Sequence, residues 1–420
     1  MIKKLAIIGL GYVGLPLAVE FSKKFNVIGF DISETRASQL NSFYDKTNEI
    51  SQGLLKKAIK KNKLLITNNN SDLSDVDCFI ITVPTPIDKN KKPDLFPLLS
   101  ASKMVGKLLR KGNIVVYEST VFPGATEEEC VPILEEFSNL KFNKDFYCGY
   151  SPERINPGDK THNLTSIKKI TSGSNHKISL EIDRLYKTII KAGTYKAPSI
   201  RIAEAAKVIE NSQRDINIAF MNELAIIFSK LNINTSEVLK AASTKWNFLD
   251  FKPGLVGGHC IGVDPFYLTH KAQSVGYNPE IILSGRKLND GMGQFVASEL
   301  VKLIIKKDFS LRSCRILVMG VTFKENCPDI RNSKVFDVIY ELKQFGLDID
   351  IYDPHADIDE IRSEHGLELL DSSNLPPFEI YQGILIAVAH KKFRNLKIRQ
   401  SVNQVIYDIK GIYNDSDLSL

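Results

Sequence analysis

One stretch near the amino terminus decides the fold class: residues 5–14 read LAIIGLGYVG. Its apolar half predicts a buried β-strand, and a helical pattern begins at the last of the glycines Gly9, Gly11 and Gly14. In this context Gly9 permits a tight turn, Gly11 lets the backbone approach a pyrophosphate, and Gly14 lets helix and strand pack closely. The pattern is typical of a dinucleotide site, in which main-chain N–H groups at the helix start bind the phosphates.

The next apolar strand ends at Asp31, 22 residues after Gly9. A carboxylate there can accept hydrogen bonds from both hydroxyls of the adenosine ribose, and it repels a 2′-phosphate. The sequence therefore predicts NAD rather than NADP as the cofactor. The alternative is a tight turn in a sheet that holds no cofactor.

Short apolar runs alternate with helical patterns over residues 1–196, which predicts βαβ units and a parallel, doubly wound sheet. A helix without proline or glycine is expected from Ile200 to Leu231, and at 1.5 Å per residue it is about 45–50 Å long. A helix of that length bridges domains or forms a subunit interface. The strands expected in the first segment are Leu5–Ile8, Val27–Phe30, Cys78–Val83, Ile114–Glu118 and Phe146–Gly149.

A second βαβ signature follows the helical middle of the chain. We expect strands at Arg315–Met319, Asp348–Tyr352, Ile384–Ala389 and Gln404–Asp408, and a helix at Lys334–Phe345. The predicted α/β architecture is two Rossmann-like domains, 1–196 and 309–420, joined by a helical domain, 197–308, that contains the long helix. Gly320 has no second or third fingerprint glycine after it, so the last domain is expected to hold a UDP moiety rather than another dinucleotide.

Composition excludes several other classes of protein. No apolar run is long enough to span a bilayer, and the first one breaks at Gly9, so neither a membrane segment nor an export signal is expected and the predicted location is the cytoplasm. The formal charge of +6 is spread along the chain, which argues against a nucleic-acid patch and suits small anionic ligands. The six cysteines show no CxxC pairing, so free thiols and no metal site are expected.

The loop Gly257-Gly-His-Cys260 predicts chemistry at a thiolate. Glycines around a cysteine allow a ligand to approach closely, and an accessible thiolate can add to an aldehyde. The thiohemiacetal can then lose a second hydride, and the thioester is hydrolysed; Asp264 could position or deprotonate the water. Read alone, Cys260 could equally be a buried core residue.

Lys207 and Asn211 share one face of the long helix, because they are four residues apart. An ammonium and a carboxamide together can stabilise an oxyanion. Read alone, such a pair is more often a solvated helix face.

With these motifs in view, the chain resembles the UDP-glucose/GDP-mannose dehydrogenases, which convert nucleotide sugars to uronic acids. The resemblance covers nearly the whole chain. Besides the motifs above, it rests on Glu118-Ser-Thr120, Ser151-Pro-Glu153-Arg-Ile-Asn-Pro-Gly158, and Phe323-Lys324 seven residues before Arg331.

The resemblance implies a role for each matched residue. Cys260 would be the nucleophile, Lys207 and Asn211 would stabilise the oxyanion, and Thr120, Glu153 and Asp264 would handle protons through an ordered water. The implied cofactor site consists of Gly9, Gly11, Tyr12, Val13, Gly14, Asp31, Arg36, Val83, Pro84, Thr85, Thr120 and Arg331. The implied substrate site consists of Glu153, Arg154, Ile155, Asn156, Lys207, Asn211, Phe248, Lys252, Gly257, His259, Phe323 and Lys324, and the loop Trp246–Gly254 would enclose the uridine.

Departures from the glucose-specific branch indicate an acetamido sugar. Pro157 and His259 stand where that branch has an acidic and a smaller residue, and Asp45-x-Thr47-x-Glu49 looks like the N-acetylhexosamine branch. The implied substrate is UDP-N-acetylglucosamine, UDP-N-acetylgalactosamine or a manno epimer, for a surface polysaccharide such as capsule or O-antigen. His259 either touches the substrate or fills space. The implied assembly is a homodimer formed through the long helix.

Three functions remain open on the sequence. One is a four-electron nucleotide-sugar 6-dehydrogenase, with UDP-glucose as the alternative substrate. The second is a two-electron hydroxy-acid or alcohol dehydrogenase, which needs neither Cys260 nor the last domain. The third is a non-catalytic sensor of NAD or a nucleotide sugar. A yield of two NADH per product separates the first from the others.

Overall fold

The computed structural model of the chain describes residues 2–61, 63–155, 163–258 and 261–420. Asn156, Pro157, His259 and Cys260 lie outside the described residues, so the expectations for them stay predictions. Contacts divide the chain into two units. The first comprises Met1–Glu210 with Phe266–Tyr277, and the second comprises Asn211–Pro265 with Asn278–Leu420.

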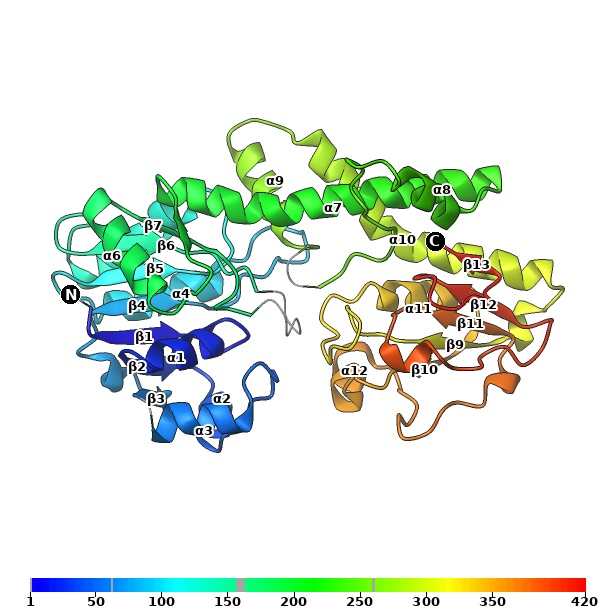
Figure 1. Cartoon of the computed structure of the whole chain (residues 1–420), viewed down its shortest axis with the longest axis horizontal. Helices are drawn as coiled ribbons and strands as arrows, with labels where there is room; N and C mark the ends of the chain where they lie inside the picture. Colours follow the sequence, from blue (N-terminus) through cyan, green and yellow to red (C-terminus); the bar gives the residue numbers. More distant parts are fainter. Residues whose placement is uncertain (1, 62, 156–162, 259–260) are drawn as a thin grey trace. The chain divides into compact units, whose positions relative to one another are not determined.

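The first unit is built on an eight-stranded sheet in the order β3-β2-β1-β4-β5-β6-β7-β8 (Figure 1). All neighbouring strands pair in parallel except β6 and β7, which are antiparallel. The strands are β1 (Lys4–Ile8), β2 (Asn26–Phe30), β3 (Leu64–Thr67), β4 (Cys78–Ile81), β5 (Ile114–Tyr117), β6 (Tyr147–Tyr150), β7 (Lys169–Gly173) and β8 (Thr194–Lys196). The helices are α1 (Gly14–Ser22), α2 (Glu34–Asn41), α3 (Gln52–Lys60), α4 (Phe96–Gly106), α5 (Val131–Ser138) and α6 (His176–Lys187).

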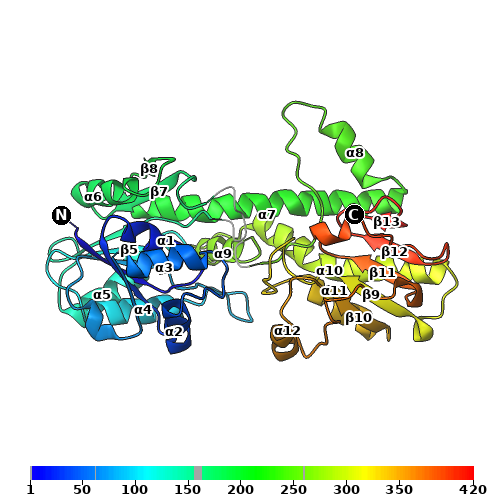
Figure 2. The same ribbon diagram turned by 60° about the horizontal axis from the view of Figure 1, so that its bottom comes forward.

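Helices cover both faces of this sheet, because its strands are apolar on both sides. Ile80 of β4 and Val116 of β5 join one core with residues of α1, α3 and α6. The neighbouring residue Tyr117 points to the opposite face, where its hydroxyl hydrogen-bonds Ser102 of α4 at 2.7 Å. Figure 2 shows α6 beside β7 and β8 at the end of the sheet.

A helical middle follows the first sheet along the chain. Its longest helix, α7 (Ile200–Leu231), has the bounds that the sequence predicts, and the border between the units falls within it, after Glu210. The other helices of the middle are α8 (Thr235–Ala242), α9 (Asp264–Ser274) and α10 (Glu280–Lys306). In the part of the chain that the structure describes, no helix has the length and apolar character needed to cross a membrane.

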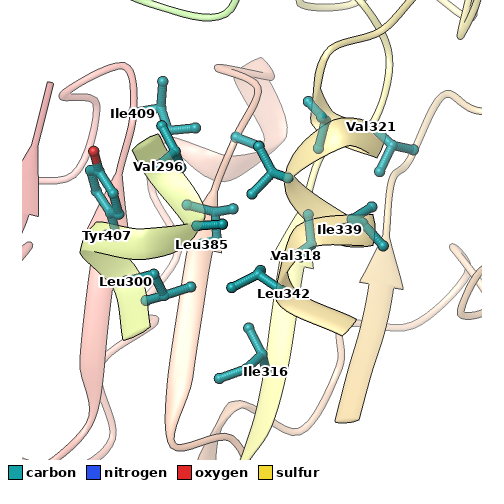
Figure 3. Packing of buried hydrophobic residues seen from close by; sticks show 14 of the residues in the cluster. Val296, Leu300, Ile316, Val318, Val321, Ile339, Leu342, Leu385, Tyr407 and Ile409 are labelled. Atoms are coloured by element: carbon teal, nitrogen blue, oxygen red, sulfur yellow. The ribbon is translucent and has the colours of Figure 1, made fainter. Parts of the chain in front are cut away.

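The second unit contains a five-stranded parallel sheet in the order β10-β9-β11-β12-β13. Figure 3 shows Val296 and Leu300 of α10 packed with Leu385 of β11, in a core that α11 also joins. Its strands and further helices are β9 (Arg315–Met319), β10 (Asp348–Tyr352), β11 (Gly383–Ile386), β12 (Val405–Asp408), β13 (Leu418–Ser419), α11 (Val335–Gln344) and α12 (Ile358–His365). The chain is therefore an α/β protein with two mainly parallel sheets and a helical middle, as predicted.

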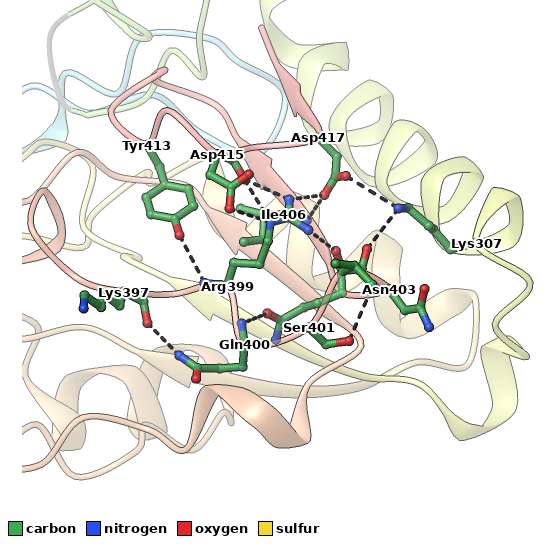
Figure 4. A network of polar contacts seen from close by, with 12 residues as sticks. Lys307, Lys397, Arg399, Gln400, Ser401, Asn403, Ile406, Tyr413, Asp415 and Asp417 are labelled. Carbon is green, nitrogen blue, oxygen red and sulfur yellow. Dashed lines mark hydrogen bonds and ion pairs between the residues drawn. The ribbon is translucent and has the colours of Figure 1, made fainter.

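Arg399 fastens the end of the chain to the second sheet (Figure 4). Its guanidinium donates to Asp415 and to Asp417, each at 2.8 Å. Asp417 in turn accepts from the main-chain N–H of Ile406 in β12. This network brings residues 415–417 to the edge where β13 pairs.

Candidate functional site

The predicted motifs of the first unit follow the carboxyl ends of four adjacent parallel strands. Gly9 follows β1, Val83 lies two residues after β4, Thr120 three residues after β5, and Glu153 three residues after β6. These strands are neighbours in the order β1-β4-β5-β6. Ligands of open parallel sheets bind at this edge, so the structure brings the motifs together at the expected place.

The glycine turn after β1 has the shape of a phosphate-binding cradle. Gly9 has a φ of +95°, which favours glycine. A Cβ on Gly14 would lie 1.8 Å from the carbonyl oxygen of Gly9, so only glycine fits the start of α1, whereas a Cβ on Gly11 would have no neighbour within 4 Å. Helix α1 has no side-chain cap, and the N–H of Leu15 already bonds the carbonyl of Gly11 at 3.2 Å, so an anion would meet main-chain N–H groups in the glycine turn before the helix. The turn fits the pyrophosphate of NAD.

Asp31 is fixed by the main chain on both of its carboxylate oxygens. The N–H of Leu10 donates to Oδ2 and the N–H of Ser33 donates to Oδ1, each at 2.9 Å. Each oxygen keeps a second lone pair for a ribose hydroxyl. The carboxylate is thus preorganised beside the glycine turn.

Arg36 donates hydrogen bonds to the same turn, and its positive charge is neutralised by Asp45. Its Nε and Nη2 donate to the carbonyl of Leu10 at 3.0 and 2.8 Å, and Nη2 also pairs with Asp45 at 2.8 Å. Burial acts to raise the pKa of Asp45, but hydrogen bonds from Thr47 and Ile50 and the charge of Arg36 outweigh it and lower that pKa. The Asp45-x-Thr47-x-Glu49 motif therefore organises its own loop and neutralises Arg36.

The loop after β4 also reaches the glycine turn. Cγ1 of Val83 lies 3.3 Å from the position of a Cβ on Gly9. The hydroxyl of Ser119 donates to the carbonyl of Val83 at 2.5 Å, which links this loop to the end of β5. The remaining predicted cofactor residues of this unit are half-buried or exposed: Tyr12, Val13, Pro84, Thr85 and Thr120.

Glu153 belongs to a buried ionic cluster that the sequence did not predict. Its Oε1 accepts from the N–H groups of Arg154 and Ile155, each at 2.6 Å. Its Oε2 pairs with Nζ of Lys169 at 3.1 Å, and the same Nζ lies 2.6 Å from Oε2 of Glu118. The other oxygen of Glu118 accepts from a tyrosine hydroxyl of α6.

The charge state of this cluster depends on Glu118. Burial raises the pKa of Glu118 to about 7, even though Lys169 acts to lower it, and Glu153 raises it further. The pKa of Lys169 is also raised: burial acts to lower it, but Glu118 and Glu153 together prevail. Lys169 therefore stays protonated between the two carboxyl groups.

The first turns of α7 hold two of the strand-end loops. Glu204, which is fully buried, accepts from the N–H groups of Gly124 and Thr126 at 2.6 and 2.9 Å. Arg154 pairs with Glu210 at 2.8 Å and donates to a carbonyl at 2.7 Å, so its guanidinium is engaged within the protein. Lys207 lies between these anchors along α7 and is 7% exposed.

In the second unit, Asn211 contacts Asp264 directly. Nδ2 of Asn211 donates to Oδ2 of Asp264 at 2.5 Å. Asp264 is 1% exposed and begins α9, where the helix N-terminus favours a carboxylate. The two residues that the resemblance places around Cys260 therefore form one hydrogen-bonded pair.

The loop before Cys260 is anchored at Gly254 and again at Gly258. The side chain of Asn222 in α7 accepts from the N–H of Gly254 at 2.7 Å and donates to its carbonyl at 3.0 Å. The N–H of Gly258 donates to the carbonyl of Asn332 at 3.2 Å. A Cβ on Gly258 would lie 2.8 Å from the Phe323 ring, so the loop passes closely over the turn that follows β9.

A buried polar network in α7 and α10 supports Asn222. Its Nδ2 also donates to Asn289 at 2.8 Å, and Asn289 donates to Asp215 at 2.7 Å. Asp215 pairs with Arg286 at 2.6 Å. All four side chains are at most 2% exposed.

The other predicted residues of the second unit are dispersed along its loops. Lys252 is exposed and Phe248 half-buried, while Trp246 is 92% exposed. Arg331 forms a two-point pair with Asp329, at 2.8 and 3.1 Å. Gly257 packs against the Asn332 carbonyl, where a Cβ would lie only 2.3 Å away, and Lys324 follows Phe323 in the same turn.

The turn after β9 repeats the geometry of the turn after β1. Gly320 has a φ of +88°, and Asp353, after β10, accepts from the N–H groups of Val321 and His355 at 2.7 and 2.8 Å. Here Nε2 of His390 also bonds the carboxylate at 3.1 Å, and both side chains are fully buried. Asp353 is therefore closed to a ribose, which agrees with the expectation that this domain binds no second dinucleotide.

Three family models match the chain. They are the NAD binding domain, the central domain and the UDP binding domain of the UDP-glucose/GDP-mannose dehydrogenase family, at residues 3–190, 201–291 and 317–415. The UDP-N-acetyl-D-glucosamine 6-dehydrogenase of Pseudomonas aeruginosa is 56% identical over 424 residues, covering 99% of each chain. Protein CapL of Staphylococcus aureus is 53% identical, covering 100% of this chain and 98% of that protein. The solved UDP-D-ManNAc dehydrogenase of Pyrococcus horikoshii matches with a TM-score of 0.89 at 28% identity, covering 99% and 98%.

Proposed function

Because the chain belongs to the UDP-glucose/GDP-mannose dehydrogenase family, we propose that it oxidises the C6 alcohol of UDP-N-acetylglucosamine to the uronic acid. The geometry that supports this proposal is the hydrogen bond between Asn211 of α7 and Asp264 at the start of α9. Asp264 follows Cys260 by four residues in the sequence. The substrate follows from similarity, since identity is 56% to a UDP-N-acetyl-D-glucosamine 6-dehydrogenase and 28% to a UDP-D-ManNAc dehydrogenase.

The proposed reaction removes four electrons in two oxidations. NAD, when bound at the Gly9–Gly14 turn, supplies the hydride acceptor for each oxidation. The alcohol loses a hydride and a proton to give an aldehyde. The Cys260 thiolate adds to that aldehyde, and the aldehyde oxygen takes up a proton to give the thiohemiacetal. The thiohemiacetal loses the second hydride and its hydroxyl proton to give a thioester. Water then adds to the thioester carbonyl, the C–S bond breaks, the thiolate leaves, and the carboxylate forms with release of the two protons of the water.

The chain's own residues have distinct roles in this scheme. Lys207 and Asn211, on one face of α7, would stabilise the negative oxygen of the alkoxide and of the tetrahedral intermediates. Glu153, Thr120 and Asp264 would accept and deliver protons through an ordered water. The turn after β9, with Lys324, would hold the UDP phosphates.

We also propose that the protein acts as a homodimer through α7. Five large apolar side chains of this helix are 43–59% exposed: Ile202, Ile209, Phe220, Ile227 and Leu231. Their spacings of 7, 11, 7 and 4 residues place them in one narrow stripe, since an α-helix turns about 100° per residue. A second copy of the stripe is the occupant that the resemblance implies. The uronic acid would enter a surface polysaccharide such as capsule or O-antigen.

The proposed function is tested with purified protein, NAD and a panel of UDP-sugars. We expect two NADH per uronate, and a kcat/KM for UDP-N-acetylglucosamine roughly ten- to hundredfold above that for UDP-glucose, because an acetamido pocket loses contacts with glucose. Cys260→Ser should stop the second oxidation while NAD still binds.

Other results would support other functions. Equal or better turnover of UDP-glucose would show that UDP-glucose is the substrate, as in the glucose branch of the family. One NADH per product would indicate a two-electron dehydrogenase, and binding of NAD and sugar without any NADH would indicate a sensor.

A further inference from the structure

The two oxygens of Glu153 are held in different ways. The main-chain N–H groups of the next two residues, Arg154 and Ile155, each donate to Oε1 at 2.6 Å, and these bonds do not depend on neighbouring side chains. Oε2 contacts Nζ of Lys169 at 3.1 Å. The direction of this second oxygen therefore depends on a side chain that starts strand β7, 16 residues further along the chain.

Lys169 is itself held in place by a second carboxylate. Its side chain is 3% exposed, and its Nζ lies 2.6 Å from Oε2 of Glu118, whose side chain has no exposure. Tyr186 donates its hydroxyl to the other oxygen of Glu118, and the ammonium lies 5.6 Å from the Tyr186 ring centroid. Strands β5 and β7 and helix α6 thus converge on one ammonium group.

Stability alone does not explain such a cluster. Buried ion pairs are often replaced by apolar residues of similar volume with no loss of stability, because desolvation of the charges offsets their attraction. With both carboxyl groups ionised, the three groups of this cluster have a formal sum of −1, which is unfavourable in a buried place, and burial accordingly raises the pKa of Glu118. A buried ionic cluster that does not add stability suggests a functional role when one of its members, here Glu153, takes part in the proposed reaction.

We propose that Lys169, held by Glu118, is a positioning residue that orients Oε2 of Glu153 for proton transfer during thioester hydrolysis. The inference rests on the proposed function, because it assigns Glu153 the proton of the attacking water. In that step water adds to the thioester carbonyl, its proton passes to Glu153, the C–S bond breaks and the Cys260 thiolate leaves. A carboxylate turned away by the loss of Lys169 could not take that proton.

The test compares three variants with wild-type enzyme: Lys169→Met, Lys169→Arg, and Lys169→Met combined with Glu118→Gln. We expect Lys169→Met to lower kcat at least tenfold, with the Kd of NAD unchanged, and to accumulate the acyl-enzyme, seen as added mass on Cys260 by mass spectrometry after quenching. Lys169→Arg keeps a charged donor and should stay within about threefold of wild type. The double variant contains no uncompensated buried charge from Glu118, so it should fold with a Tm near wild type and still be slow.

The double variant decides between positioning and simple charge balance. Recovery of wild-type kcat in it would mean that Lys169 only neutralises Glu118, and would overturn the proposal. Lys187→Met, which removes a 57%-exposed lysine from α6, is the matched control and should leave kcat unchanged. A wild-type enzyme that releases no second NADH would instead refute the proposed function, so the two failures are distinguishable.

Discussion

At the scale of single residues, main-chain N–H groups fix both oxygens of Asp31, whereas one oxygen of Glu153 depends on the side chain of Lys169. Gly9, Gly14 and Asp31 have the turn and contacts that their motif predicts. Glu118 and Lys169 meet only in the folded protein, because 51 positions separate them along the chain. Glu118 gives one signal in the sequence, as a charged residue at the end of an apolar strand, but this signal does not identify Lys169 as its partner.

Asp31 should decide which dinucleotide binds. Asp31→Ala removes the carboxylate that the Leu10 and Ser33 N–H groups orient, so the KM for NAD should rise roughly tenfold or more and the preference for NAD over NADP should shrink. The measurement is kcat/KM with each dinucleotide. Glu34→Ala removes the same charge from the exposed first turn of α2 and should leave the preference intact. A wild-type enzyme that prefers NADP would show that the ribose assignment is wrong.

At the scale of elements, strong periodic patterns were predictable and weak ones were not. The bounds of α7, β9 and β10 agree with the prediction because their apolar runs are long or clearly interrupted. Four short strands were missed: β3 (LLIT), β7 (KITSG), β8 (TYK) and β13 (LS). The segments of β7 and β8 are also polar, and they fold as strands only beside the existing sheet. The antiparallel pairing of β6 with β7 has no sequence signature at all.

Asn222, which residues of α7 and α10 hold in place, should position the loop that carries Cys260. Asn222→Ala breaks both hydrogen bonds to Gly254 and leaves a buried main-chain pair without a partner, so the free energy of unfolding should fall by about 1–3 kcal/mol. Because the loop loses one of its anchors, kcat/KM for the UDP-sugar should also fall, roughly tenfold or more, with NAD binding unchanged.

Gln404→Ala is the matched control for this variant. Gln404 is also a buried carboxamide, and it donates to the carbonyls of Phe378 and Tyr381 at 2.7 and 2.9 Å, away from the Cys260 loop. It should lose comparable stability, measured by chemical denaturation, and keep its kcat/KM. If the two variants had the same kinetics, the role assigned to Asn222 would be wrong.

At the scale of the whole molecule, the exposed apolar stripe of α7 predicts the oligomeric state. Phe220→Glu together with Ile227→Glu places two charges in the stripe, and burying them in a dimer would be unfavourable. Sedimentation should give twice the 47.1 kDa chain mass for wild type and the chain mass for the variant. Ile305→Glu, which changes an exposed residue of α10, should remain a dimer. A monomeric wild type at micromolar concentration would contradict the proposal.

The matching turns after β1 and β9 have an evolutionary consequence. Duplication of one ancestral strand–helix–strand unit would explain why, in both sheets, a left-handed glycine is followed by an acid with equivalent main-chain partners. In the second sheet His390 bonds that acid inside the protein, so the acid is closed to a coenzyme. We therefore expect that, among related enzymes, the preference for the sugar donor changes mainly with residues of the second half of the chain. Asp353 should be kept, because it holds the loop after β10 through its main-chain hydrogen bonds.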